Sequence, residues 1–538
     1  MKCEVKAAMA MLLASVMLSA CGGGGGSGST GDASSSASSA ASSGGSSSSA
    51  SEASSSSSST ATISSLGADG WASVGTGTTG GHGAASDKIY TVSNRNELIQ
   101  ALYGKGASIA DDGSVSGTLD ASPKIIYVSG TISLNMNKAL VEYTDDAYVQ
   151  ASCAATEGYA TAAAMWSAYY AAYRPSVWGV GAVSEPDSVD NVRGKPAYAR
   201  GCAATLQKKV VMLKVPSNTS IIGLGSSAKI VHGTLVLGES SAAVDNIVVR
   251  NLGFEDAFDF FPAWDPTDSN TGRWNSAYDL ISVMYATHVW IDHNTFSDGS
   301  RIDHDYPSVW TETVGGVDYS ASDFKVQHHD GLIDVTKVGN YVTISHNDFH
   351  DHDKSFLIGG TDTPSTTAEN PSVLKVTFHD NYFRNLKQRQ VRVRYGMVHL
   401  YNNYYEGSLA STANYSWLVG WTVGQSGKIH AENNVFAIGP GSNAAATVAN
   451  LYGASISTSK ITTCTALGYS ADQCGAFFYD SGTVLNGVTV NVTGAITAAY
   501  STVSGTQYWS PATYYSYGLA ATTNLASTVP AAAGVGKL

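Results

Sequence analysis

Basic residues crowd one short segment of the chain, residues 384–394. Five of the 30 Lys and Arg residues fall within it, at Arg384, Lys387, Arg389, Arg392 and Arg394. Like charges this close repel one another, so the segment requires an anionic partner. That partner is either a set of protein carboxylates on a solvated face or an acidic ligand, and composition alone does not choose between them.

Carboxylates gather in two other places. Asp268 closes the phrase at residues 264–268 and is followed by Asp279, while Asp330 and Asp334 stand four residues apart around Gly331. Clustered oxygen ligands without cysteine suit a hard cation, calcium before magnesium. The alternative is that these aspartates cap turns, as most Asp-Gly pairs do.

A third phrase, His-Asp-His-Asp-Lys at residues 350–354, has the composition of a zinc site. Adjacent residues on a strand alternate between its two faces, so they would not all converge on one ion. We therefore predict no zinc site there.

An irregular sequence repeat indicates the secondary structure that positions these residues. A β-branched residue is followed five positions later by Asn and two positions after that by an aromatic residue, with Asn at positions 294, 347, 381, 403 and 434. Asn251 is interpreted as an earlier, looser copy. Asn tolerates the αL bend and its amide can bond to its copy in the next coil, so the repeat predicts a stacked parallel solenoid, an all-β parallel β-helix.

An ordinary β-sandwich is the main alternative fold. Its hairpins should show regular Asn-Gly or Asp-Gly turns, which are scarce here. Residues 140–208 depart from the repeat, because they are rich in Ala and Tyr with helix-like spacing near residues 159–173. We expect them to form a partly helical excursion from one side of the solenoid.

The start of the chain predicts export. Lys2 and Lys6 precede an apolar run at residues 7–18, and Cys21 follows soon after, so residues 1–20 match a lipoprotein signal peptide with a lipidated Cys21. The run is too short to span a bilayer. A plain secretory signal with an incidental Cys21 is the alternative.

Residues 21–65 are almost entirely Gly, Ser, Ala and Thr, which predicts a flexible linker. The protein would then be secreted, or anchored at the outer membrane or cell surface with membrane contact only through Cys21. Residues 66–538 regain aromatic and β-branched residues without a second linker and should form one domain. We expect a monomer, since a capped solenoid needs no partner.

Four cysteines remain in the predicted domain: Cys153, Cys202, Cys464 and Cys474. They allow three connectivities, and sequence proximity favours Cys153 with Cys202 and Cys464 with Cys474, as staples on excursions. The net charge of −13 argues against nucleic acid as a partner, which would require a broad basic surface.

Taken together and in this order, residues 289–293, 328–334, 350–355 and 389–405 resemble the signature blocks of the pectate lyases of polysaccharide lyase family 1. The resemblance covers residues 67–538, and the phrase at 264–268 is typical of the extracellular bacterial branch. It implies a right-handed parallel β-helix with long loop excursions, calcium as cofactor and polygalacturonate, the demethylated polymer of pectin, as substrate.

The resemblance also implies a role for individual residues. Asp279, Asp330 and Asp334 would hold the primary calcium ion, and Asp268 would help to bind a second ion that arrives with substrate. Lys354 and Arg394 would bind substrate carboxylates, and Arg389 would be the catalytic base.

These roles fit a β-elimination. Removal of the C5 proton of a galacturonate residue creates a carbanion, which preorganised positive charge on the adjacent carboxylate would stabilise. The 4-O glycosidic bond then breaks and leaves a 4,5-unsaturated sugar. Arginine is normally protonated, so crowding by neighbouring cations and alkaline conditions should help Arg389 to act as a base.

Val391 departs from the family pattern, which has proline at this place. On a straight strand Arg389 and Arg394 would face opposite sides, so we expect a bend near Gln390 that brings both into one cleft. Proline would fix such a bend, whereas here the surrounding structure must do so.

Three other functions are weighed against this one. A polygalacturonase needs paired carboxylates and several short phrases, of which only Gly81, His82 and Gly83 occur in sensible form. A pectin lyase would lack the calcium carboxylates that Asp279, Asp330 and Asp334 supply. A pectin-binding adhesin would bind in a calcium-dependent manner without forming the unsaturated product.

Overall fold

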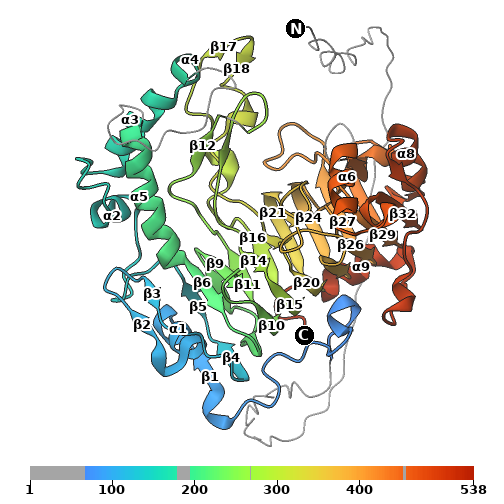
Figure 1. The fold of residues 1–538 in the computed structure, drawn as a ribbon, viewed down its shortest axis with the longest axis horizontal. Coiled ribbons are helices and arrows are strands. Elements are labelled where there is room, and N and C mark those ends of the chain that lie inside the picture. The colour runs from blue at the N-terminus through green and yellow to red at the C-terminus, as the bar shows by residue number, and fades with distance from the viewer. Residues whose placement is uncertain (1–66, 179–193, 267, 452–455) are drawn as a thin grey trace, which may run out of the picture. The chain divides into compact units, whose positions relative to one another are not determined.

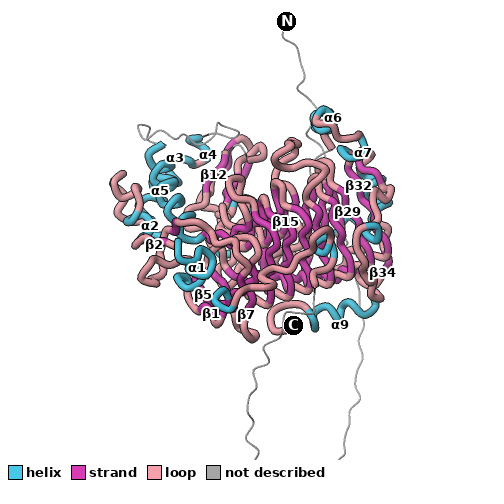
Figure 2. Tube along the Cα trace, turned by 60° about the horizontal axis from the view of Figure 1, so that its bottom comes forward, coloured by secondary structure: helices cyan, strands magenta, loops and turns pink. Residues whose placement is uncertain are grey.

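Three successive strands make each repeating unit of the fold. In the computed structural model, which describes residues 67–178, 194–266, 268–451 and 456–538, a strand of an 11-stranded sheet leads to a strand of a 10-stranded sheet and then to one of an 8-stranded sheet. Strands with the same role in successive coils pair in parallel, for example β10, β15 and β20. Figure 2 shows the strands stacked side by side. The predicted all-β parallel β-helix is confirmed.

The strands of each sheet have the following bounds. The 11-stranded sheet contains, in order, β1 (Ile89–Val92), β4 (Lys124–Val128), β7 (Thr219–Gly223), β10 (Val244–Arg250), β15 (Ala286–Asp292), β20 (Asn340–Ser345), β23 (Lys375–His379), β26 (Met397–Tyr401), β29 (Lys428–Glu432), β32 (Ala476–Ser481) and β35 (Val503–Ser504). The 10-stranded sheet contains β5 (Thr131–Ser133), β8 (Lys229–Val231), β11 (Gly253–Glu255), β16 (Thr295–Ser297), β21 (Asp348–Lys354), β24 (Tyr382–Gln388), β27 (Tyr404–Ser408), β30 (Val435–Gly439), β33 (Val484–Leu485) and β34 (Val488–Thr489). The 8-stranded sheet contains β6 (Met212–Val215), β9 (Thr234–Leu237), β14 (Ile281–Met284), β19 (Ile333–Thr336), β22 (Phe356–Ile358), β25 (Val391–Val393), β28 (Trp421–Val423) and β31 (Ala449–Leu451).

The fold also contains short antiparallel hairpins and helices outside the three large sheets (Figure 1). The hairpins are β2 (Ser108–Ile109) with β3 (Val115–Ser116), β12 (Ala263–Asp265) with β13 (Arg273–Asn275), and β17 (Thr313–Val314) with β18 (Val317–Asp318). The helices of the described residues are α1 (Arg95–Tyr103), α2 (Asp145–Ala151), α3 (Ala162–Tyr173), α4 (Pro175–Trp178), α5 (Gly194–Val211), α6 (Thr458–Ala466), α7 (Ala471–Cys474), α8 (Val492–Ala499) and α9 (Thr522–Ala532). None of them is both long and apolar enough to cross a bilayer.

The interior of the coils is filled by matching side chains stacked one above another. Phe296, Phe349, Phe383, Tyr405 and Phe436 form one such row, with successive ring centroids between 4.1 and 5.3 Å apart. All five are fully buried. This row explains the aromatic position of the sequence repeat, because an apolar ring at the same place in each coil packs on its copy.

The repeated asparagines form a second buried row. The side-chain amide of Asn294 donates to that of Asn347 at 3.0 Å, and the same bond joins each later pair as far as Asn434. The bend lies one residue earlier than we expected, since the αL conformation belongs to the residue before each ladder Asn, such as His293 with φ 53°. Asn251 occupies this αL position with φ 57° and is not a copy of the ladder, which begins at Asn294.

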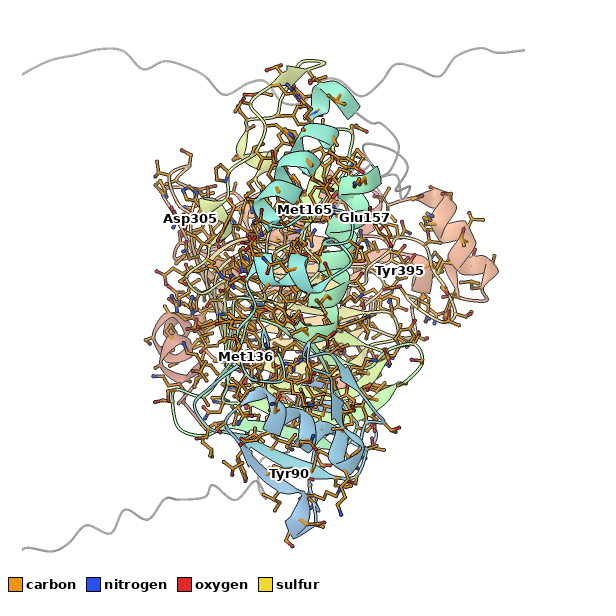
Figure 3. The ribbon with its side chains drawn as sticks, turned by 90° about the vertical axis from the view of Figure 1, so that its left-hand side faces the viewer. Tyr90, Met136, Glu157, Met165, Asp305 and Tyr395 are labelled. Carbon is orange, nitrogen blue, oxygen red and sulfur yellow. A yellow bond between two sulfur atoms is a disulfide. The ribbon has the colours of Figure 1, made fainter. Side chains whose placement is uncertain are left out.

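The excursion expected at residues 140–208 contains α2, α3 and α5, and it joins β5 to β6. Met165 of α3 is one of its buried residues (Figure 3). A disulfide joins Cys153 to Cys202 within this excursion, and a second joins Cys464 to Cys474 between α6 and α7. These are the pairings that sequence proximity favours. The signal peptide, the linker and Cys21 lie outside the described residues.

Candidate active site

Five of the seven predicted site residues lie in or beside one class of connection, the passage from the 10-stranded to the 8-stranded sheet. Asp279 precedes β14, Asp330 precedes β19, and Asp334 is the second residue of β19. Lys354 ends β21, and Arg389 lies between β24 and β25. Parallel stacking of the coils places these five residues along one edge of the 8-stranded sheet.

Two carboxylates close on Gly331 from either side. A Cβ atom built at Gly331 would lie 2.5 Å from Asp334 Oδ1 and 2.8 Å from Asp279 Oδ1, so no side chain fits there. The Gly331 N–H donates to Asp279 Oδ1 at 2.9 Å, and Ser282 Oγ donates to Asp279 Oδ2 at 2.5 Å. The backbone N–H of Leu357 donates to Asp334 Oδ1 at 3.0 Å. Each carboxylate is thus held in a fixed orientation.

Asp330 completes a group that we call the aspartate cluster: Asp279, Asp330 and Asp334. Lys354 Nζ lies 3.2 Å from Asp330 Oδ1, and the Lys354 side chain is 9% exposed. Burial and the nearby charge of Asp330 raise the pKa of Asp279 to about 7. Burial together with Asp279 and Asp330 raises the pKa of Asp334 well above its usual value. The cluster therefore has more negative charge than its neighbouring cations neutralise.

The bend expected near Gln390 is present and begins at Arg389, whose φ is 58°. Gln390 and Val391 are both fully buried, so the alternation of faces breaks between them. The Arg389 guanidinium lies close enough to the cluster to oppose the rise in the pKa of Asp334. Val391 fills the family's proline place by packing in the core.

Arg389 also lines a pocket with Arg392, which lies in register with Leu357 and Thr422. Leu418, Val419, Asn450 and Leu451 form the remaining wall together with Gln388 and Thr422. The pocket therefore offers two guanidinium groups beside apolar and amide side chains. A chain of sugar acids could contact all three kinds of group there.

Two other predicted site residues, Arg394 and Asp268, bond to partners outside the aspartate cluster. Arg394 Nε donates to Asp362 Oδ1 at 2.6 Å, and its Nη1 donates to the carbonyl of Gly359 at 3.0 Å. Asp268 lies between β12 and β13, where Asn275 Nδ2 lies 3.4 Å from Asp268 Oδ2. Among the described residues, no hydrogen bond or ion pair connects Asp268 with the aspartate cluster.

The polar side chains of residues 350–354 have different partners. His350 Nδ1 lies 2.8 Å from Asp351 Oδ2, while His352 Nδ1 lies 2.5 Å from Asp298 Oδ1. Asp353 lies 3.0 Å from Lys325 Nζ and accepts a hydrogen bond from Gln388 at 2.8 Å. The alternate residues of this phrase thus bond to different parts of the molecule.

Several of these partners belong to what we call the buried ion network: Asp256, Asp298, Asp303, Asp353, Lys325, His329 and His352. His329 lies between two carboxylates, with Nε2 3.0 Å from Asp256 and Nδ1 2.9 Å from Asp303. Burial opposes its ionisation, but Asp298, Asp256 and Asp303 raise its pKa to about 10. Lys325 contacts both Asp303 and Asp353 at 3.0 Å.

The network reaches the aspartate cluster through His352, whose Nε2 lies 2.8 Å from the backbone carbonyl of Asp330. A carbonyl oxygen only accepts, so this nitrogen carries a proton and donates. It reaches the Arg389 segment through Gln388, which donates to Asp353. His352 and Asp353 are adjacent on β21, so one strand supports both the aspartate cluster and the Arg389 segment.

Sequence reasoning missed these supporting residues. Ser282 and Asp362 stand in no recognisable phrase, and Asp298 is 54 residues from its partner His352. The alternating His and Asp of residues 350–354 were the available signal. Their alternation excluded a shared ion but did not reveal which coil would supply each partner.

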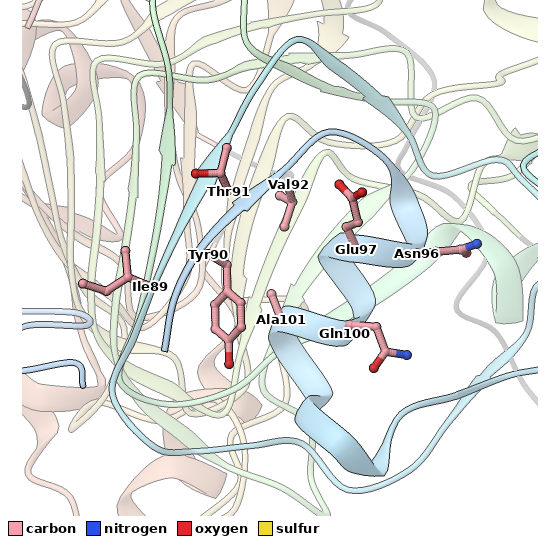
Figure 4. A pocket seen from close by; sticks show the side chains of 8 residues that line it. All are labelled: Ile89, Tyr90, Thr91, Val92, Asn96, Glu97, Gln100 and Ala101. Atoms are coloured by element: carbon pink, nitrogen blue, oxygen red, sulfur yellow. The ribbon is translucent and has the colours of Figure 1, made fainter. Parts of the chain in front are cut away.

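A second hollow, lined partly by Tyr90, Glu97 and Gln100 of β1 and α1, lies near the N-terminal end of the described residues (Figure 4). Glu97 is its only acidic or basic lining residue, and its carboxylate accepts a hydrogen bond from the backbone N–H of Ser93 at 2.8 Å. This hollow offers no group of convergent charges. The pocket at Arg389 is the better candidate for chemistry.

Comparison with known proteins decides the family. The family model described as pectate lyase matches residues 183–538. This chain belongs to the pectate lyase family. A pectate lyase of Bacillus subtilis (strain 168) is 38% identical over 475 residues, which cover 87% of this chain and 92% of the relative. Pectate lyase E of Dickeya dadantii (strain 3937) is 30% identical and covers 89% of each chain.

Solved structures of other pectate lyases agree. The pectate lyase from Acidovorax avenae subsp. citrulli is 58% identical with a TM-score of 0.84, and the match covers 89% of this chain and 96% of that one. A pectate lyase bound to a hexasaccharide is 36% identical with a TM-score of 0.68, covering 87% and 97%. This pectate lyase is therefore an enzyme of the polysaccharide lyase class, which confirms the resemblance found in the sequence.

Proposed function

We propose that this pectate lyase cleaves (1,4)-α-D-galacturonan, the polygalacturonate of pectin, by calcium-dependent β-elimination. The observation that carries the proposal is the meeting of the aspartate cluster with Lys354 and Arg389 at one edge of the 8-stranded sheet. In this proposal Asp279, Asp330 and Asp334 bind the primary calcium ion. Asp268, on the β12–β13 hairpin, contributes to a second ion only when substrate is bound.

The donor set suits calcium. All ligand atoms offered by the cluster are carboxylate oxygens, which hard cations prefer. Burial, and then repulsion between neighbouring aspartates, raises the pKa values of Asp279 and Asp334, and a bound divalent cation would favour their ionised forms. When bound, calcium would neutralise the galacturonate carboxylate and so make the adjacent C5 proton more acidic.

The protein side chains supply the remaining functions. Lys354 is held beside Asp330 at 3.2 Å and would place its ammonium group on the substrate carboxylate. Arg394, oriented by Asp362 and the Gly359 carbonyl, would bind a second carboxylate. The αL conformation at Arg389 turns this residue out of the regular strand alternation, so that it could face the C5 hydrogen.

The reaction would balance as follows. Arg389, in its unprotonated form, takes the C5 proton, and the electron pair of the C–H bond forms the C4–C5 double bond. The C4–O bond breaks at the same time or afterwards, the leaving oxygen takes a proton from water, and Arg389 returns the C5 proton to the solvent. The products are a 4,5-unsaturated oligogalacturonide and a new sugar end, and no water is added to the glycosidic bond.

The test measures the ultraviolet absorbance of the conjugated product with polygalacturonate as substrate. Arg389→Ala should lower kcat by about 10²- to 10⁴-fold, the range for loss of a positioned base, while calcium affinity stays unchanged. A chelator of calcium should abolish the wild-type signal. An Arg389→Ala variant that retained the wild-type rate, or a rate insensitive to chelation, would contradict the proposal.

We also propose that the chain is exported as a lipoprotein, with Cys21 as the lipidated residue and residues 21–65 as a tether, and that it acts as a monomer. The support is the cysteine placed three positions after the end of a short apolar run in the sequence. Cys21→Ser should move the protein from the membrane fraction to the soluble fraction. Equal partition of both forms would show that Cys21 is no anchor, and light scattering of the soluble form would give the oligomeric state.

A further inference from the structure

Two histidines and a glutamate meet on the outer face of the 11-stranded sheet. His399 of β26 and His430 of β29 are directly opposite in the parallel register, and Glu432 follows His430 by two positions on the same face. Their neighbours Val398, Leu400 and Ile429 point into the core. The group therefore lies on a different sheet from the candidate active site.

The atoms of this group are spaced as ligands of one ion. Glu432 Oε2 lies 3.2 Å from His399 Nε2 and 3.3 Å from His430 Nε2, and one ligand atom from each residue lies within 4.8 Å of the others. Bonds of about 2.0–2.1 Å in a tetrahedral site place ligand atoms roughly 3.3 Å apart. Both distances from Glu432 to the imidazoles match this spacing.

The orientation of His430 points to a ligand that is not a protein group. The residue is only 2% exposed, and neither ring nitrogen makes a well-formed hydrogen bond among the described residues. Nε2 lies 3.3 Å from Glu432 Oε2, an oxygen that already accepts from the Tyr517 hydroxyl. A buried polar nitrogen without a partner is unfavourable, and an ion between the imidazole and the carboxylate would satisfy it.

Tyrosines from the C-terminal segment orient the other two side chains. The Tyr515 hydroxyl lies 3.0 Å from His399 Nδ1, the ring nitrogen opposite the one that faces Glu432. The Tyr517 hydroxyl donates to Glu432 Oε2 at 2.6 Å. Metal sites use such outer partners to fix the tautomer of a histidine and the direction of a carboxylate.

We propose that His399, His430 and Glu432 form a second metal site, which takes a divalent transition ion of the zinc class. Two imidazoles and one carboxylate suit zinc, whereas calcium takes oxygen ligands. The site would fasten residues 515–517 to the coils that carry β26 and β29. Its role is to stabilise the C-terminal end of the solenoid, apart from catalysis.

The direct test uses the full chain, stripped of metal and then titrated with zinc chloride by calorimetry in the presence of excess calcium. The wild type should bind zinc, and crystals grown with zinc should show an anomalous peak between the three side chains. His430→Phe and Glu432→Gln should each weaken binding by more than the roughly 10- to 100-fold effect of losing an outer partner. Zinc should also raise the Tm of the wild type but not of these variants.

His232→Gln is the matched control, because it also removes one imidazole that lies beside a glutamate. His232 Nδ1 lies 2.6 Å from Glu142 Oε1, but His232 belongs to no group of three possible metal ligands among the described residues, so we expect no change in zinc affinity. Cleavage of polygalacturonate by each variant shows that it is folded. Absence of the anomalous peak, or zinc binding that His232→Gln removes and His430→Phe leaves intact, would overturn the proposal.

Discussion

The aspartate cluster and the buried ion network use the same acidic side chain in opposite electrostatic settings. In the network, burial opposes the charge of Asp303 and Asp353, but Lys325 lowers the pKa of both carboxyls. In the cluster, burial and neighbouring aspartates raise the pKa of Asp279 and Asp334. The two groups are connected, because His352 bonds to the Asp330 backbone.

The difference shows which group is complete in the folded protein. The network contains its own cations, so its charges are neutralised when the chain folds. The cluster has Lys354 and Arg389 nearby but still favours protonation, so it is suited to take a cation from solution. A carboxylate of the candidate active site can thus be distinguished from a structural carboxylate by whether the folded protein already supplies its counter-charge.

The largest expected effect comes from breaking the network. Asp353→Asn should lower the free energy of unfolding by about 3–5 kcal/mol, because Lys325 loses one of its two buried partners. Urea denaturation with calcium present measures this change. A variant as stable as the wild type would show that the network contributes little to folding.

Removing a carboxylate from the aspartate cluster should lower activity without lowering the stability of the metal-free protein. Asp334→Asn should lower kcat/KM by about 10²- to 10³-fold, the range for losing one preorganised electrostatic group. The Tm without calcium should stay equal or rise, since repulsion with Asp279 is relieved. A strong fall in the metal-free Tm would place Asp334 with the structural carboxylates instead.

His352 joins the two regions, so its substitution tests the connection. His352→Gln keeps one donor but loses the ion pair with Asp298, and should raise the calcium concentration needed for half-maximal activity by about 10- to 100-fold. Saturating calcium should restore most of kcat. His350→Gln is the control, because His350 pairs with Asp351 and has no bond to Asp330 among the described residues. Equal behaviour of the two variants would argue against a positioning role.

The smallest effect is a pH-dependent gain in Tm with calcium. The raised pKa of Asp279 means that its stabilising contribution in the metal-free protein is full below about pH 4 and is lost as the pH rises through about 7. Calcium replaces the missing proton, so the gain in Tm should be several degrees larger at about pH 8 than at about pH 5. Calorimetric scans at both pH values check this, and a gain independent of pH would contradict it.

The fold was largely predictable because each coil repeats the same local signals. The Asn and aromatic positions recur, and both rows are buried in the structure. Asn251 was misassigned since a single Asn after a strand fits either the αL position or the ladder position. The register of β10 with β15, in which Arg250 pairs with Asp292, and the φ of Asn251 separate the two.

The candidate site was predictable only in part. Asp279, Asp330, Asp334, Lys354 and Arg389 were identified by the resemblance, and the structure brings them to one edge of a sheet. The partners of His352 and Arg394 come from different coils or loops, at Asp298 and Asp362. Spacing within one coil contains no information about such contacts, because loop lengths between coils vary.

These five residues lie at or beside the same corner in four successive coils, with Asp330 and Asp334 in one coil. The central strands need only keep their stacking, while each corner can be lengthened, shortened or rewritten. An engineer who wishes to recognise a differently decorated sugar polymer could therefore exchange corners such as residues 409–420 individually. The distance between corresponding corners of neighbouring coils would stay fixed by the strand spacing, about 4.8 Å in a β-sheet.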